Sequence, residues 1–496
     1  MVILQLSTAM QLFFYDILIC KRMLILVFGV LALLFGYLFY SRLLEHIFMP
    51  FRADTPAVAK ADGMDYVPQR RTKNLLIQFL NIAGTGPIFG AIMGAKWGPI
   101  VFLWIIFGTI LGGAVHDYMS GMMSMRHGGT SVTGLVPRYL GKWVRYPILI
   151  LMVFLMVMVS ATFARSASDL LVEITGISLN FWIFIILLYF MSSTVLPIDK
   201  LIGRLYPVFG VLLIVMAVAI IGGLWVEGYA FPDMVLENLH PHGDDYFPDM
   251  FITVACGAIS GFHATQSPLI ARCTVNERDG RMIFYGAMAV ESVVALIWAT
   301  ASLAYYGGTA GLTDALASGG ASGVVYDISI AVAGPIGGLL AVIGVIICPV
   351  TSGDTALRAA RMMVQDDRHM DPSNLRATIQ LTVLLSVFIV GLCLLDFSVL
   401  WQYFSWLNQT LACIVLWTAT VFILKTVSHR YYSLMTALPA MFMTMVVTSF
   451  IVSTGQGLGL GHVIGMYAGA AMTVISAVLY VRELYLLRGH ETASFP

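Results

Sequence analysis

The feature that most constrains this 496-residue sequence is a series of long apolar runs separated by short polar breaks. Each run approaches or exceeds the roughly 20 residues that cross about 30 Å of hydrocarbon as a helix, without the alternation of a membrane barrel strand. Only 11% of the residues are charged, against roughly 25% in soluble domains. The sequence therefore predicts an all-α polytopic membrane protein.

Thirteen runs reach spanning length, near residues 23–41, 75–95, 97–122, 145–166, 179–197, 203–226, 250–272, 281–306, 326–350, 376–396, 398–424, 431–453 and 460–487. If alternate loops lie on the same side of the membrane, almost all of the 27 Lys and Arg residues fall on one side. The exceptions on the other side are Lys21, Arg22, Lys96 and Arg165. Cytoplasmic loops are enriched in these residues. The pattern predicts an outside N-terminus and a cytoplasmic C-terminus.

Two of the predicted spans are interrupted by glycine, at Asn81–Pro87 and at Cys256–Pro268. Unpaired backbone amides cost several kcal/mol each in hydrocarbon, so a broken helix must be buried in protein or line a polar cavity. Glycine also serves helix packing, but the prolines at these interruptions favour functional breaks. Two breaks at matching positions of an inverted repeat are typical of a transporter's binding site.

The topology divides the chain into two five-helix units of opposite orientation, residues 75–226 and 250–424, each opening with a broken helix. Residues 1–22 form an N-terminal extension, with Met23 as an alternative start, and 23–74 hold the first span and a basic loop. Residues 425–496 add two C-terminal spans and a short tail.

Composition limits the partners. Lys plus Arg and Asp plus Glu both number 27, which gives no basic surface for nucleic acid. The six cysteines are scattered and mostly lie in apolar helices, so neither a metal site nor a disulfide is predicted. We expect contacts with membrane lipid and a small-molecule substrate, and no cofactor; the sequence leaves the oligomeric state open.

Several stretches resemble the carbon starvation (CstA) family of bacterial inner-membrane transporters: Thr55–Val58, Asp62–Pro68, Ile82–Pro87, Gly112–Asp117, Cys256–His263, Arg358–Asp366 and Asn408–Ala412. The resemblance implies proton-coupled uptake of a small organic nutrient, such as a peptide or pyruvate, and a fold like the amino-acid/polyamine/organocation superfamily. The sequence differs from long members of the family at Ile77-Gln78, because those members carry a pair of histidines at the corresponding positions.

Asn81, Thr85 and the backbone of Gly84 and Gly86 are candidate substrate contacts at the first interruption. Proline suits the first position of a restarting helix, whose free amides and partial positive charge favour a substrate carboxylate. The alternative is that these groups only satisfy the interruption itself.

Ser260, His263 and Ser267 would share one face of the seventh span if that helix persists. His263 is a candidate for binding substrate or carrying a proton, because its unperturbed pKa is near 6.5. Ser260 and Gln266 join it as candidate substrate contacts. The alternative for His263 is a structural hydrogen bond between helices.

Asp117, beside His116, is the leading candidate for proton coupling, and Glu291 is the second. A charged side chain at this depth costs at least about 2.5 to 3.5 kcal/mol on insertion scales, and is usually functional. The alternative is that Asp117 pairs with Arg126 or with His116.

Asn408 and Gln409 are candidates either for completing a polar substrate site or for interhelical bonding. Thr351 and Ser352, expected at the inner end of the ninth span, lie where sodium-coupled proteins of this fold offer hydroxyl ligands, so Na⁺ is the less favoured coupling ion. Residues 354–369 are interpreted as an amphipathic surface helix or a basic solvated loop.

Two other functional classes compete with transport. Ser260 and His263 suggest an intramembrane serine hydrolase, but residues 258–262 lack the Gly-x-Ser-x-Gly elbow, and no zinc-protease motif is present. A nutrient-binding membrane sensor is the third class. The sequence favours a transporter.

Overall fold

The computed structural model describes residues 24–48, 54–62, 66–195, 202–370 and 374–487. The predicted extension 1–22 and the alternative start at Met23 lie outside the described residues. The described chain is helical apart from loops and a single bridge between Gln69 and Thr274. The all-α prediction is confirmed.

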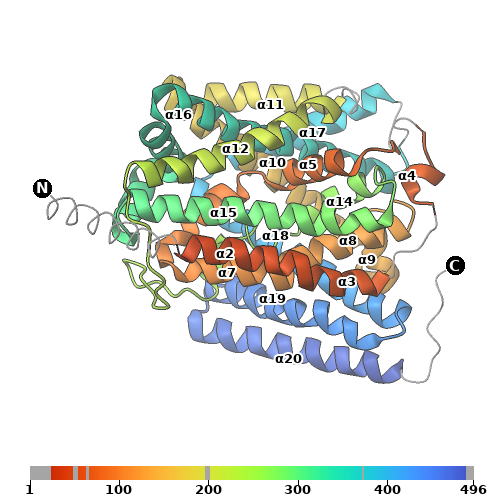
Figure 1. Cartoon of the computed structure of the whole chain (residues 1–496). Coiled ribbons are helices and arrows are strands. Elements are labelled where there is room, and N and C mark those ends of the chain that lie inside the picture. Colours follow the sequence, from red (N-terminus) through yellow and green to blue (C-terminus); the bar gives the residue numbers. More distant parts are fainter. Residues whose placement is uncertain (1–23, 49–53, 63–65, 196–201, 371–373, 488–496) are drawn as a thin grey trace, which may run out of the picture.

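The helices of the first half lie roughly parallel to one another in Figure 1, with second-half helices such as α15 and α18 among them. Their bounds are α2 Leu24–Phe35, η1 Gly36–Tyr40, α3 Ser41–Phe48, α4 Pro56–Ala59, α5 Arg71–Ile82, η2 Gly86–Gly90, α6 Ala91–Gly94, η3 Ala95–Trp97, α7 Ile100–Gly108, η4 Thr109–Gly113, α8 Ala114–Arg126, α9 Val132–Leu140, η5 Lys142–Val144, α10 Arg145–Thr175, α11 Leu179–Val195 and α12 Ile202–Val226.

The second half adds α13 Asp249–Thr253, α14 His263–Ala271, η7 Glu277–Asp279, η8 Arg281–Tyr285, α15 Gly286–Tyr305, α16 Thr309–Asp367, α17 Leu375–Cys393, α18 Phe397–Thr426, η9 Arg430–Ser433, α19 Leu434–Ser453 and α20 His462–Leu486. The last two pack against each other at one edge of the bundle, the lower edge in Figure 1.

Eleven of the described helices are long and apolar enough to cross a membrane, and the bent pair Arg71–Ile82 and Gly86–Trp97 makes a twelfth. The predicted number of thirteen therefore needs revision. The run at 179–197 appears as a shorter apolar helix, Leu179–Thr194. The run at 250–272 is divided into two short helices, α13 and α14.

The prediction of a ninth span at residues 326–350 was wrong. Gly320 and Gly334 have non-helical backbone angles that divide α16 into three pieces, and its last apolar helix runs Gly337–Asp367. Thr351 and Ser352 consequently lie inside a helix instead of at its end. Arg358 and Arg361 are 9% and 8% exposed, so the solvated-loop and surface-helix interpretations of 354–369 are also wrong.

The two ends of the bundle differ in charge. One end, which we call the basic end, carries Lys73, Arg126, Arg138, Arg145 and Arg272. Figure 1 shows α3, α4 and α9 gathered there, at the right of the view. The opposite, acidic end carries the loop 227–248, whose acidic residues are Glu227, Asp233, Glu237, Asp244 and Asp245.

The loop 227–248 is held over the end of the first broken helix. The indole of Trp97 donates to the carbonyls of Asp244 and Asp245, at 3.1 Å each. The ring of His240 packs on Trp97 with centroids 5.0 Å apart. Burial lowers the pKa of His240 below its ordinary value, while nearby Asp244 acts in the opposite direction.

Candidate functional site

The first break lies between α5 and η2, where the helix axis bends by 57°. Ala83 leaves the helical region, and the amides of Ile88 and Phe89 then donate to the carbonyl of Thr85. Four side-chain atoms here are buried without a hydrogen-bond partner among the described residues: Gln78 Oε1, Gln78 Nε2, Asn81 Oδ1 and Thr85 Oγ1. Buried polar atoms are normally paired, so this break is suited to a polar ligand.

The second break spans residues 254–262, between α13 and α14. The side chain of Asn408 from α18 accepts a 2.6 Å hydrogen bond from the amide of Phe262 and a 3.2 Å bond from the Ser260 hydroxyl. Gln409 donates at 2.5 Å to the carbonyl of Phe251 in α13. Both amides therefore satisfy the broken backbone, as in the interhelical alternative stated above.

Two sequence interpretations of the second break need correction. Pro268 lies inside α14, five residues after it begins at His263, and does not mark the break. Ser260 lies in the non-helical stretch, so it shares no helical face with His263 and Ser267. Ser267 instead donates to the carbonyl of His263 and accepts from Ser120 of α8 at 3.1 Å.

The two breaks touch each other. A Cβ added to Gly86 would lie 2.1 Å from Cβ of Cys256, a distance at which backbone or side chain must shift. A Cβ added to Gly257 would lie 3.7 Å from the Cα of Pro87, which is an ordinary contact distance between the two breaks. Glycine is therefore required at position 86 by packing between the broken helices, as well as by any role in binding.

A cluster of four ionisable side chains joins α8, α14 and α15, and we call it the charged cluster: His116, Asp117, His263 and Glu291. Nδ1 of His116 lies 2.8 Å from Oδ1 of Asp117, and Nδ1 of His263 lies 2.9 Å from Oδ2. All four side chains are fully buried. Of the sequence alternatives for Asp117, the pairing with His116 is observed, whereas Arg126 pairs with Glu277 at 2.6 Å.

The charged cluster can hold its protons in more than one arrangement. A carboxylate only accepts hydrogen bonds, so an ionised Asp117 requires a proton on Nδ1 of both histidines. Nε2 of His263 faces Oε2 of Glu291 at 3.5 Å. With Asp117 ionised, either Glu291 is protonated beside a neutral imidazole, or the imidazole is protonated beside a carboxylate. Nε2 of His116 is also buried and has no hydrogen-bond partner among the described residues.

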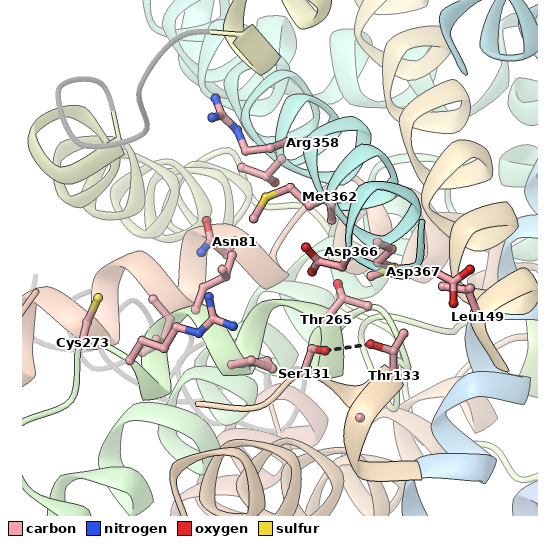
Figure 2. A pocket seen from close by; sticks show the side chains of 18 of the residues that line it. Asn81, Ser131, Thr133, Leu149, Thr265, Cys273, Arg358, Met362, Asp366 and Asp367 are labelled. Atoms are coloured by element: carbon pink, nitrogen blue, oxygen red, sulfur yellow. Dashed lines mark hydrogen bonds between the residues drawn. The ribbon is translucent and has the colours of Figure 1, made fainter. Parts of the chain in front are cut away.

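A cavity of about 1300 Å³ opens at the basic end and reaches the first break. Figure 2 shows Asn81 of α5, Thr265 of α14 and Arg358 and Met362 of α16 around it. We call it the vestibule. Its charged residues are Lys73, Arg138, Lys142, Arg145, Arg272, Arg358, Asp366 and Asp367. The excess of basic side chains favours an anion.

The vestibule reaches the first break and stops short of the charged cluster. Asn81 lines its wall, whereas His116, Asp117, His263 and Glu291 do not. Among the residues that line the vestibule, Thr265 is the nearest in sequence to the charged cluster, two residues after His263. The hydroxyl of Thr265 accepts a 2.9 Å hydrogen bond from the side chain of Gln266. The other side-chain atom of Gln266, Oε1, is buried and has no partner in the described part of the chain.

Ser352 of α16 lies beside the end of α5, with its hydroxyl 3.5 Å from the carbonyls of Leu80 and Asn81. Thr351 instead bonds the carbonyls of Ile347 and Cys348 in its own helix. Among the described residues, no group of three or more His, Cys, Asp and Glu side chains is arranged to hold a metal ion.

Sequence reasoning missed three residues of this region. Gln78 precedes Asn81 by one helical turn and was identifiable as a polar residue in an apolar run. Asp354 is 2% exposed and accepts from Ser193 at 2.6 Å; it was hidden because 354–369 was assigned to a loop. Phe163 lies against Gly84, and nothing in a phenylalanine within an apolar run indicates that contact.

A family model described as carbon starvation protein CstA matches residues 21–240, 232–306 and 306–450. The chain belongs to the carbon starvation protein CstA family. The resemblance of the sequence motifs is thereby confirmed.

Curated relatives of this CstA-family chain include named transporters. An uncharacterized membrane protein of Haemophilus influenzae is 40% identical over 59% of this chain and 94% of its own length. The peptide transporter CstA of Helicobacter pylori is 28% identical over 53% of this chain, and the pyruvate/proton symporter BtsT of Escherichia coli is 28% identical over 55%. The chain spans about half the length of these two transporters, 48% of each.

Solved structures share the fold of the CstA-family chain. A manganese transporter from Eremococcus coleocola superposes with a TM-score of 0.54 at 12% identity, covering 84% of this chain and 94% of that one. MhsT, solved in complex with L-phenylalanine, gives 0.50 at 15% identity, covering 84% and 99%. These relatives and structures give no support to the hydrolase and sensor alternatives.

Proposed function

We propose that this CstA-family chain is a secondary active transporter that imports a small organic nutrient by proton symport and alternating access. Relatives named as a peptide transporter and a pyruvate/proton symporter support this function, as does a fold shared with transporters. The vestibule, closed at one end and reaching a broken helix, has the form expected of one open state.

The observation that carries the proposal is the charged cluster. Two carboxylates and two imidazoles are fully buried between three helices, one of which, α14, begins at the second break. Removing charges from water is costly unless they are paired. Gain or loss of the proton between His263 and Glu291 changes the charge balance of the cluster. A protonation step is thereby linked to the packing of α8, α14 and α15.

The substrate is bound at the first break in this proposal. Asn81, Thr85 and the backbone of Gly84 and Gly86 supply polar contacts, and the helix that restarts at Gly86 favours a carboxylate. Gln78 and Gln266 also carry buried amide atoms without a partner among the described residues, so both are further candidates for substrate contacts. Peptides, pyruvate and amino acids each carry a carboxylate, so they form the candidate set.

The orientation follows from the basic end. Basic loops favour the cytoplasm, so we place the basic end, the vestibule opening and the C-terminus on the cytoplasmic side of a bacterial inner membrane. The N-terminus is then outside. In this orientation the structure is open to the cytoplasm and closed to the outside.

Sodium is the alternative coupling ion. The hydroxyl of Ser352 and the carbonyls of Leu80 and Asn81 are oxygen ligands of the kind that a hard cation takes. The observed contacts join only these three oxygens, which is fewer than such a cation needs. Replacing Na⁺ by choline separates the two ions: uptake driven by protons is unchanged, whereas uptake driven by sodium is lost.

The experiment that tests the function uses the full chain reconstituted in vesicles with labelled pyruvate and labelled dialanine. One pH unit corresponds to about 1.4 kcal/mol per proton, which supports up to about tenfold accumulation in symport of one proton. We expect accumulation of one of the two solutes when the outside is acidic, and none when the gradient is collapsed by a protonophore. Equal uptake with and without the gradient would refute proton symport.

A further inference from the structure

Aromatic rings fill the space between the two breaks and the acidic end of the bundle. Ring centroids of Phe163 lie 6.1 Å from Phe262 and 5.9 Å from Phe404, and Phe404 lies 5.4 Å from Trp401. Phe89 and Phe397 continue the series against Trp401, at 6.4 and 5.8 Å. We call these six residues the aromatic column.

The column runs away from the vestibule. α5 begins at the basic end, so Phe89, which follows the first break, lies on its acidic-end side. Phe397 is the first residue of α18 at the acidic end, and Trp401 and Phe404 are one and two turns further in. Phe163 and Phe262 are therefore the innermost members, level with the breaks.

Phe163 is the member that covers the first break directly. A Cβ added to Gly84 would lie 2.4 Å from the ring atom Cζ of Phe163, so the ring occupies the space above that backbone. Gly353 of α16 lies 3.4 Å from Cβ of Phe163 by the same construction. The side chain therefore packs between the non-helical backbone at Gly84, which its ring covers, and Gly353 of α16, which lies beside its Cβ.

The two sides of the first break thus differ. On the basic side the vestibule reaches Asn81, and on the other side a fully buried aromatic ring lies on Gly84. A solute bound at Gly84 and Thr85 contacts that ring, and a solute arriving from the acidic end must displace it.

We propose that Phe163 is a specificity-determining residue of the transporter, whose ring closes the first break toward the acidic end and limits the size of the substrate bound there. This inference rests on the proposed transport function, because Phe163 can limit the size of a substrate only if the chain binds one. The closing of the break is a geometric statement that can be tested without transport.

The test of closure uses Thr85→Cys in the full chain with the six native cysteines replaced, in vesicles of each orientation. A membrane-impermeant methanethiosulfonate reagent is added to the face that carries the acidic end. With Phe163 present we expect slow modification, and with Phe163→Ala we expect a rate about tenfold higher, because removing the ring raises the fraction of open states.

Phe190→Ala is the matched control. Phe190 is also fully buried and also lies on Gly353, at 2.4 Å from a Cβ built there, but it has no contact with Gly84. We expect modification of Cys at 85 to stay slow in this control. An equally raised rate in the two variants would overturn the proposal, because loss of packing in general would then control access. No increase in either variant would also overturn it, because the ring of Phe163 would then not close the break.

Phe163→Leu covers the case in which the alanine variant does not fold, since buried Phe→Ala substitutions commonly cost several kcal/mol. Thermal melting of each purified variant identifies that case. The leucine variant should give an intermediate modification rate. A rate equal to that of the parent in a folded Phe163→Leu protein would count against the proposal.

Size selection is measured in the same variants by competition. Uptake of labelled pyruvate is inhibited either by dialanine or by unlabelled pyruvate, and the ratio of the two inhibitory potencies is compared between variants. We expect Phe163→Ala to raise this ratio about tenfold in favour of dialanine. The ratio should not change in Phe190→Ala. An unchanged ratio would remove the selectivity role while leaving closure intact. Absence of any uptake, together with altered labelling at position 85, would refute the proposed transport function and keep the closure.

Discussion

At the second break, Asn408 and Gln409 reach in from α18 and bond the backbone on both sides of the gap, at 2.6 and 2.5 Å. At the first break, the only described side chain that approaches the backbone in this way is Ser352, at 3.5 Å. The first break keeps unpartnered amide and hydroxyl atoms on Gln78, Asn81 and Thr85. The vestibule also reaches only the first break.

This difference suggests separate tasks for the two breaks. Asn408 and Gln409 bond the backbone of the second break, and His263 of the charged cluster follows it, so we propose that the second break serves proton binding. The first break retains polar atoms for a ligand. We therefore expect substitutions at the two breaks to cause defects in different assays.

The largest difference should come from Asp117→Asn. The amide can accept from only one of the two imidazoles through its oxygen, and it presents N–H groups to the other. We expect accumulation driven by a pH gradient to be lost, while exchange of labelled for unlabelled substrate continues because it needs no net proton movement. Both are measured in the same vesicles.

The control for Asp117→Asn is Asp169→Asn, because Asp169 pairs with Arg165 outside the charged cluster, at 3.0 Å. The Arg165–Asp169 pair is only partly buried, and normal accumulation in this control shows that losing an ion pair elsewhere in the helices is insufficient to abolish coupling. Wild-type accumulation in Asp117→Asn would remove the charged cluster from the coupling step, and with it the assignment of the proton to the second break.

The second largest effect is expected for a substitution at the contact between the two breaks. Gly86→Ala places a methyl group where Cβ of Cys256 lies, and overpacking in a tight core costs roughly 1 to 3 kcal/mol. We expect a lower melting temperature and loss of uptake. Adding Cys256→Gly should restore much of the stability, because it removes the atom that collides.

A double-mutant cycle on melting measures this coupling. If Cys256→Gly leaves the Gly86→Ala protein as unstable as before, the breaks are separated in the membrane and the contact is not the cause. If stability returns but uptake does not, position 86 also has a role in binding.

The third prediction compares one asparagine from each break. Asn408→Ala leaves the amide of Phe262 buried without its acceptor, which costs about 1 to 3 kcal/mol, so the melting temperature should fall. Asn81→Ala removes an atom that has no partner in the described residues, so stability should be almost unchanged. Substrate affinity should fall about tenfold in Asn81→Ala only. The reverse pattern would exchange the two tasks.

The sequence was sufficient for the class of protein and for the presence of two breaks, because glycine and proline inside apolar runs are visible without any contact. It was insufficient for α16. Gly320 and Gly334 divide that helix, and Arg358 and Arg361 are buried because they bond the carbonyls of Ser193 and Thr194 at the end of α11. Charge alone placed those arginines in solvent.

The charged cluster shows the same limit for the site. His116 and Asp117 are neighbours in sequence and could be paired in advance, whereas His263 reaches Asp117 across 146 residues of sequence. Glu291 joins the cluster through His263 and not through Asp117. Asn408 could not be assigned to the backbone of Phe262 for the same reason. The sequence identifies which residues are unusual in a membrane, and the contacts decide their partners.

The smallest effect is expected for Ser352→Ala, and it decides the coupling ion. At 3.5 Å from the carbonyls of Leu80 and Asn81, the hydroxyl forms at most weak hydrogen bonds with the first break. If protons alone drive uptake, the substitution should change the rate less than about twofold, in the range of a lost weak hydrogen bond. Ser160→Ala is the control, since Ser160 bonds the carbonyl of the adjacent Gly353 at 3.1 Å and has no contact with the first break. A severe loss confined to Ser352→Ala and partly reversed by high Na⁺ would show instead that the first break holds a cation, and the separation of ligand and proton between the breaks would have to be revised.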